Sequence, residues 1–149
     1  MFIFNEYTLN VTIGILVNMD MFQKIVKWNE ERGLIEKGFN HQKEISFIIE
    51  ELLESTGAYD SDTAREKALS YAEEITQHGQ GNDENLVDAF SDIIVYATGA
   101  IAKIGYDPSK VMDEVYQEIN SRTGTFIDGK FVKDQNVQIY KADLSSCKF

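Results

Sequence analysis

The chain has 149 residues, of which 43% are hydrophobic, so it is long enough to bury the core of one ordinary domain. Its 25 Asp and Glu outnumber its 14 Lys and Arg, and the formal net charge of -11 argues against binding a nucleic acid polymer through its phosphates. The single cysteine, Cys147, cannot form a disulfide within the chain, so we expect a reducing, cytoplasmic location.

The first 18 residues are β-prone or aliphatic, with polar interruptions. They contain no Lys or Arg, so they do not resemble a secretion signal, and their apolar run is too short to span a bilayer. Three interpretations stay open: an added strand, an extended arm, or translated sequence upstream of a start at Met19 or Met21. We therefore expect an arm of uncertain role over residues 1–18 and a single domain over residues 19–149.

Three helices are predicted in the first half of the domain. The first spans about Asp20 to Gly33, and the third spans about Ala64 to Gln77. The apolar content of the third is thin, so we expect it to be more exposed than its neighbours. The second covers Glu44–Glu54, and its apolar residues recur at helical spacing: Ile45, Ile48, Ile49, Leu52 and Leu53.

Two acids, Glu51 and Glu54, project together from the second helix, away from its apolar stripe. Like charges this close repel each other unless a cation lies between them. On a chain this acidic, a solvated acidic face is the favoured interpretation from this helix alone.

The longest predicted helix, Glu84 to about Ile104, changes that balance. Asp88 and Asp92 lie one turn apart on a face that otherwise carries small and apolar residues, so this face should be covered. Two covered carboxylates need a partner because an isolated buried charge is very costly, and a metal cluster becomes the favoured interpretation. The opposite face provides the expected core stripe: Leu86, Phe90, Ile93, Ile94, Ala97, Ile101 and Ile104.

A last helix begins at Pro108 and runs to about Arg122, followed by a hairpin over 126–132 with a two-residue Asp-Gly turn. No internal repeat or low-complexity linker separates these elements. The sequence predicts an all-α fold of four to five helices in a bundle, with a short C-terminal β-hairpin.

The chemistry expected from the acids follows from what the chain lacks as well as what it has. Clusters made only of carboxylates suit Mg²⁺ or Mn²⁺, whereas a di-iron bundle would need Glu-x-x-His pairs. His41 and His78 have no partner at zinc-ligand spacing, and no Walker-type glycine loop is present. Mg²⁺ held by a few carboxylates commonly has substrate phosphates in its remaining positions, so metal-assisted hydrolysis of a phosphoanhydride is the reaction class that follows.

The acidic helices and the hairpin also carry a resemblance to a known family, the all-α nucleotide pyrophosphohydrolases of the MazG type. This family is related to dimeric dUTPases, dCTP pyrophosphatases and phosphoribosyl-ATP pyrophosphatase. Glu50–Glu54 is similar to the family's E-E-x-x-E helix, and Asp88–Gly99 is similar to its second acidic helix. Gly105–Asp107 and the hairpin at 128–133 fit the branch that resembles phosphoribosyl-ATP pyrophosphatase. The match extends from about Met21 to Phe149.

The resemblance implies an all-α bundle that cuts nucleoside triphosphates between the α and β phosphorus atoms and works as a homodimer or a dimer of dimers. It implies Mg²⁺, with Mn²⁺ as a substitute, held by Glu51, Glu54 and Asp92. The family often has a Glu where this chain has Ala89, and Asp88 is the natural replacement, one turn from Asp92.

Glu50 and Glu51 are the candidate catalytic residues. Glu50 either supports the metal ligands or orients the attacking water, and the sequence does not separate these roles. The candidate substrate contacts are Lys103 and Arg122 for phosphate and Asn120 for the base or sugar, although a helix C-terminus favours such residues in any case. Trp28 could stack on a base but fits a core position better.

The leading hypothesis is a Mg²⁺-dependent hydrolase of a (deoxy)nucleoside triphosphate with a role in nucleotide-pool housekeeping. A narrower enzymatic alternative is phosphoribosyl-ATP pyrophosphohydrolase. The alternative from a different class is a non-enzymatic helical dimerisation or adaptor module whose acids only maintain solubility. The preferred base and the size of the oligomer are not predicted.

Overall fold

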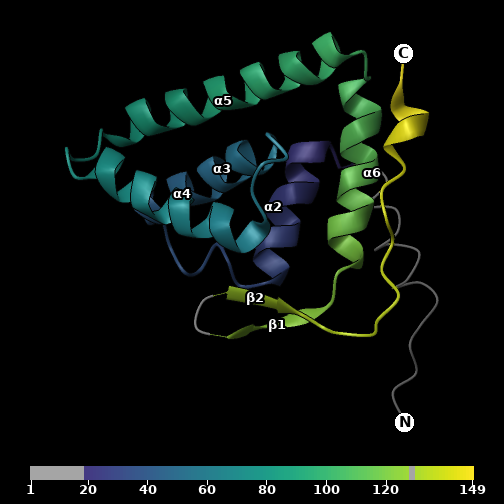
Figure 1. Ribbon diagram of the computed structural model, residues 1–149, viewed down its shortest axis with the longest axis horizontal. Coiled ribbons are helices and arrows are strands. Elements are labelled where there is room, and N and C mark those ends of the chain that lie inside the picture. The colour runs from purple at the N-terminus through teal and green to yellow at the C-terminus, as the bar shows by residue number, and fades with distance from the viewer. Residues whose placement is uncertain (1–18, 128–129) are drawn as a thin grey trace. The chain divides into compact units, whose positions relative to one another are not determined.

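The computed structural model describes residues 19–127 and 130–149, and most of this length is helical (Figure 1). In these residues the elements follow in the order α2, α3, α4, α5, α6, β1, β2, with a short 3-10 helix, η1, near the C-terminus. The expected all-α character with a small hairpin is thereby confirmed. The chain divides into two compact units: Leu34–Asp92 forms one, and the described residues of Met1–Gly33 join Ile93–Phe149 in the other.

Side-chain caps determine where most helices begin. The carboxylate of Asp20 accepts the backbone N–H of Gln23 at 2.8 Å, while the Gln23 side chain accepts the backbone N–H of Asp20 at 3.0 Å. These reciprocal bonds satisfy backbone groups that the first turn leaves without intrahelical partners. The capped helices and their N-caps are α2 (Met21–Glu31) after Asp20, α3 (His41–Glu54) after Asn40, α4 (Ser61–Thr76) after Asp60, and α6 (Pro108–Ser121) after Asp107.

The Leu34–Asp92 unit is built on the packing of α3 against α4. Ala64, Ala68 and Ala72 recur every fourth residue along α4 and are fully buried. The prediction that this helix is more exposed than its neighbours holds against α3, most of whose residues are partly buried, but fails against the long helix that follows α4, which has no buried residue. Alanine adds little hydrophobicity to a sequence, yet its small side chain lets two helices approach closely, while the larger Leu69 and Ile75 of α4 stay exposed.

The long helix α5 (Asp83–Ile104) has no buried residue. The described residues do not bury the expected core stripe, since Ile93 and Ile94 are exposed, and they leave the other face open too, with Val95 65% and Tyr96 76% exposed. The predicted stripe is correct as a helical pattern, but no other described element covers it. Despite this apolar surface, no helix among the described residues is both long and apolar enough to cross a bilayer.

In the other unit, α2 packs on α6, and the indole Nε1 of Trp28 donates to the carbonyl of Ile119 at 3.2 Å. The C-terminal segment runs beside α6 (Figure 1). The backbone N–H of Tyr140 donates to Ser121 Oγ at 2.9 Å, and that of Asp143 donates to the Glu114 carboxylate at 3.0 Å. These bonds tie a stretch without regular structure to a helix.

The predicted hairpin forms from β1 (Gly124–Ile127) and β2 (Lys130–Lys133), which pair antiparallel with Ile127 opposite Lys130. This register leaves two residues for the turn, as predicted, although residues 128–129 themselves lie outside the described part of the chain. Beyond the hairpin, η1 (Leu144–Cys147) ends with a buried free thiol at Cys147.

Candidate functional site

The four acids predicted as metal ligands all lie in the Leu34–Asp92 unit. Glu51 and Glu54 stand in the last turns of α3, with Glu51 exposed and Glu54 partly exposed. Asp88 and Asp92 are exposed and lie one turn apart in α5. The structure therefore agrees with the helical placement of both pairs, but it exposes the aspartates that we expected to be covered.

The described part of one chain does not gather these acids into a single metal site. No three Asp, Glu, His or Cys side chains within it are arranged to hold a metal ion. The main helix contact of α3 is with α4, which carries none of the predicted ligands. The described residues thus offer these acids as pairs and not as one cluster, and the substrate, water or a second chain could supply further ligands.

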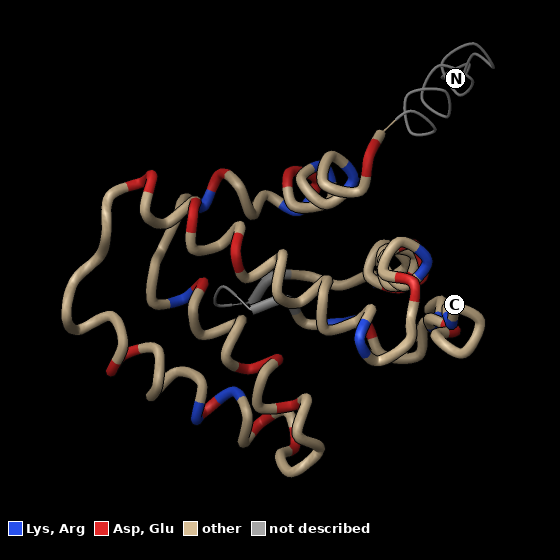
Figure 2. The backbone as a smooth tube through the Cα atoms, turned by 90° about the horizontal axis from the view of Figure 1, so that it is seen from above, with Lys and Arg blue, Asp and Glu red and all other residues tan. Residues whose placement is uncertain are grey.

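The negative charge of the protein is concentrated in this unit. Leu34–Asp92 contains fourteen Asp and Glu but four Lys and Arg, and the excess of red over blue can be followed along the tube in Figure 2. Among the described residues, Glu54, Asp88 and Asp92 take part in no ion pair. The mutual repulsion of these acids would be relieved by a bound cation.

Glu50 differs from Glu54, Asp88 and Asp92 because it has a cationic partner among the described residues. Arg65 Nη1 donates to Glu50 Oε2 at 2.8 Å and to Ser46 Oγ at 3.2 Å, and the Arg65 guanidinium lies 4.7 Å from the centre of the Phe47 ring. Ser46 is fully buried, and its hydroxyl donates to the carbonyl of Lys43 at 2.7 Å. With one carboxylate oxygen bound to Arg65, Glu50 fits the supporting role better than that of a base that takes a proton from water.

Arg65 is the residue of this region that sequence reasoning missed. It lies in α4, fifteen residues after Glu50, so no helical period connects the two. Only composition could have pointed to this residue, because Arg65 is the sole arginine of the acidic Leu34–Asp92 segment. An arginine in such a segment is expected to find a carboxylate, although the sequence does not say which one.

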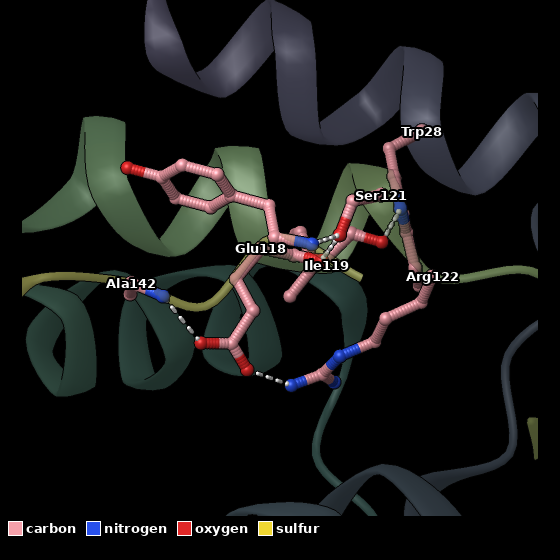
Figure 3. Close-up of polar contacts among 7 residues, drawn as sticks. Trp28, Glu118, Ile119, Ser121, Arg122 and Ala142 are labelled. Atoms are coloured by element: carbon pink, nitrogen blue, oxygen red, sulfur yellow. Dashed lines mark hydrogen bonds and ion pairs between the residues drawn. The ribbon is translucent and has the colours of Figure 1, made fainter. Parts of the chain in front are cut away.

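The predicted substrate contacts all lie in the other unit. Arg122 follows α6, and its Nη2 donates to Glu118 Oε1 at 2.7 Å (Figure 3). The Arg122 Nε atom is buried and has no hydrogen-bond partner among the described residues. Lys103, in the last turn of α5, and Asn120, near the end of α6, are both exposed. Arg122 is therefore committed to a local structural contact, whereas Lys103 and Asn120 remain accessible.

Glu118 anchors the C-terminal segment to α6. Its second carboxylate oxygen accepts the backbone N–H of Ala142 at 3.0 Å (Figure 3). The Ala142 N–H, together with the hydrogen bond and charge of Arg122, lowers the pKa of the Glu118 carboxyl below its ordinary value. The contacts of Glu118 thus stabilise its ionised form.

Trp28 is partly buried and uses its indole N–H in the bond to Ile119 (Figure 3). The Arg32 guanidinium lies 4.2 Å from the centre of the Trp28 ring. These contacts favour the structural interpretation of Trp28 over stacking on a base.

Comparison of the chain with protein-family models, with curated proteins and with solved structures returned no match. The similarity to the MazG-type family therefore depends on the short acidic motifs, their order and the helices that carry them.

Proposed function

We propose that this chain is a Mg²⁺-dependent nucleoside triphosphate pyrophosphohydrolase that releases a nucleoside monophosphate and pyrophosphate. The observation that carries the proposal is the set of acids without ion-pair partners in the described chain, Glu54, Asp88 and Asp92, on the two helices that match the family motifs. Each pair has the helical spacing that lets two carboxylates act together.

The charge of the Leu34–Asp92 unit explains why a metal ion is part of the proposal. Fourteen acids against four basic residues would repel a triphosphate that arrived alone. Mg²⁺ binds carboxylates and substrate phosphates together and neutralises charge on both. The role of Glu54, Asp88 and Asp92 is to bind the cation, while Arg65 of α4 holds Glu50, which lies one turn before Glu54 on α3.

A second copy of the chain is part of what we propose, because the described residues of one copy bury no residue of α5 and do not join the acids in one cluster. The exposed apolar side chains of α5, among them Val87, Ile94 and Val95, would be buried against the same helix of a partner. A two-fold arrangement is the simplest way to cover a surface with an identical one. Such a homodimer, alone or paired again, should show a mass above 17.0 kDa in light scattering at micromolar concentration.

The decisive assay measures pyrophosphate release from a panel of canonical and modified nucleotides with Mg²⁺. Glu51→Gln and Asp92→Asn should each lower turnover by orders of magnitude, since each removes a charged ligand at nearly constant volume. Asp92→Asn should keep or raise the stability of the metal-free protein, because it removes a repelling charge. Glu44→Gln, on α3 but away from the Glu51 and Glu54 pair, is the matched control and should leave turnover nearly unchanged.

Full pyrophosphate release by both Glu51→Gln and Asp92→Asn would contradict the assignment of the site. The phosphoribosyl-ATP alternative predicts that the gene complements a histidine auxotroph defective in this hydrolysis. The adaptor alternative predicts that the folded protein binds Mg²⁺ or Mn²⁺ no more tightly than an exposed pair of acids does. Metal titration of the parent and of Asp92→Asn separates the adaptor from the enzyme without any substrate.

A further inference from the structure

The start of α3 and the end of α4 border an open pocket that the sequence did not predict. Its volume is about 400 Å³, and the Leu34–Asp92 unit supplies all of its lining residues. The lining combines two rings, three side-chain amides and a hydroxyl, but no carboxylate and no ammonium or guanidinium group. Its members are Phe39, Asn40, His41, Gln42, Thr76, Gly79 and Gln80.

An aromatic ring forms one wall of this pocket. The Phe39 ring stacks on the His41 ring, with centroids 6.0 Å apart and planes inclined by 28°. It also meets Phe90 of α5 edge to face, at 6.2 Å and 84°. Phe39 nevertheless stays 52% exposed. Two aromatic neighbours thus orient a ring whose remaining surface is open, which suits stacking against a flat, unsaturated ligand.

Polar groups beside the ring have hydrogen-bonding capacity to spare. His41 Nδ1 is buried and has no hydrogen-bond partner among the described residues, although buried polar atoms are usually paired. Gln42 and Gln80 are exposed at the rim, and an amide can both donate and accept. The edge of a heterocycle offers the complementary donors and acceptors, whereas a saturated hydrocarbon would not.

The surrounding charge decides which part of a nucleotide this pocket would accept. The unit carries ten more acids than basic residues, so an anionic phosphate is disfavoured in a pocket that lacks a cationic side chain. A neutral base pays no such penalty. The pocket therefore suits the end of the nucleotide that carries no charge.

The position of the pocket fits a substrate whose phosphates lie at the acids. Phe90, which contacts Phe39, lies in the same stretch of α5 as Asp88 and Asp92 but on the opposite face, so the reach from the pocket to the acids is taken along α3. Along α3, His41 precedes Glu51 by ten residues, which is about 15 Å of helix at 1.5 Å per residue. An extended nucleoside triphosphate has comparable reach from its base to its terminal phosphate.

We propose that the pocket at the start of α3 binds the base ring of the nucleotide, with Phe39 as the stacking surface. This inference rests on the proposed function for the identity of the ligand, but the ring site itself can be tested without metal or phosphate. The probes are free nucleosides, each titrated into the ¹⁵N-labelled full chain and followed by amide chemical shifts. Ribose and inorganic pyrophosphate serve as probes for the other parts of the substrate.

At least one nucleoside should shift the amides of residues 39–42 and 76–80, and ribose and pyrophosphate should not. Phe39→Leu keeps an apolar side chain but removes the flat ring, and it should weaken nucleoside binding about tenfold through lost stacking. Phe22→Leu, at another exposed phenylalanine in the other unit, is the matched control and should bind as the parent does. If Phe39→Leu does not fold, Gln80→Ala at the rim should still change the relative affinities of the four common nucleosides.

The experiments distinguish a wrong assignment of the base-ring pocket from a wrong assignment of the hydrolase function. Nucleoside shifts that are absent, or equal in Phe39→Leu and Phe22→Leu, overturn the ring site. Hydrolysis with an unchanged KM in Phe39→Leu for every nucleotide overturns it too, while the hydrolase stands. Nucleoside binding without pyrophosphate release from any nucleotide supports the ring site and overturns the hydrolase.

Discussion

The ion pair between Glu50 and Arg65 allows a quantitative test of how α3 is held against α4. The perturbations are Glu50→Gln, Arg65→Met and the double variant. The two charged atoms are 2.8 Å apart, and the side chains are 22% and 25% exposed. Hydrogen bonds to charged groups contribute about 1.5–3 kcal/mol, and partial solvent access lowers this toward the value of about 1 kcal/mol for exposed pairs. We expect a coupling free energy of about 1–2 kcal/mol.

The two single variants should differ because Arg65 has more partners than Glu50. Arg65→Met also removes the donor to Ser46 and the cation above the Phe47 ring. We expect it to lower the free energy of unfolding by about 2–4 kcal/mol, and Glu50→Gln to lower it by about 1–2 kcal/mol. If Glu50 supports the site rather than accepting a proton, both variants should slow turnover similarly, and the double variant should be no slower than the worse single one.

Urea unfolding followed by circular dichroism at 222 nm gives the free energies for this cycle. The pair Lys27 and Glu31 on α2 is the matched control, since both partners are more exposed and four residues apart on one helix. Its coupling should be smaller than that of Glu50 and Arg65. A coupling below about 0.5 kcal/mol at Glu50 and Arg65, within the range of independent sites, would refute the reasoning.

Three further predictions concern the core, the tail and the assembly. Ala68→Leu should destabilise the fold by about 1–3 kcal/mol, because it overfills the contact between α3 and α4; Leu69→Ala, at an exposed neighbour, is the comparison, and an equal loss would contradict close packing. The lowered pKa of Glu118 means that its stabilising contribution is present above the unfolded value near pH 4.3 and is lost as the pH falls through the folded pKa. The difference in unfolding free energy between the parent and Glu118→Gln should therefore shrink below about pH 4. A difference between their urea midpoints that stays constant from pH 7 to pH 3 would rule this out. Val95→Lys should lower the mass measured by light scattering toward that of one chain, 17.0 kDa, whereas Val137→Lys, at an exposed valine beyond the hairpin, should not. An unchanged mass in Val95→Lys would show that α5 does not form the proposed interface.

The parts of the fold that depend on neighbours in sequence could be predicted. Asp60 before α4 and the Asp107-Pro108 start of α6 act within one turn, so a single pass along the chain finds them. The hairpin is equally local, since its register follows from a two-residue turn. The placement of Glu51, Glu54 and both aspartates on helices was predictable for the same reason.

The parts that depend on distant neighbours were not predictable. The contact of Arg65 with Glu50 joins two helices, and helical spacing carries no information about such a pair. The burial of Ala68 reflects how closely two helices approach, which hydrophobicity alone understates. For α5, the apolar pattern was read correctly, but the pattern does not say whether the covering surface belongs to the same chain.

The buried thiol of Cys147 makes the opening of the C-terminal segment measurable by chemical modification. The carbonyl of Cys147 accepts the backbone N–H of Asp107 at 2.8 Å, and the N–H of Phe149 donates to the carbonyl of Gly105 at 3.3 Å, so the thiol is 1% exposed while the segment is docked. Because the chain has one cysteine, a thiol-alkylating reagent modifies a single site, and only after this segment opens. The alkylation rate of the parent protein thus measures how often the C-terminal segment opens. The ratio of this rate to that of Glu118→Gln measures how much the Glu118 carboxylate slows the opening.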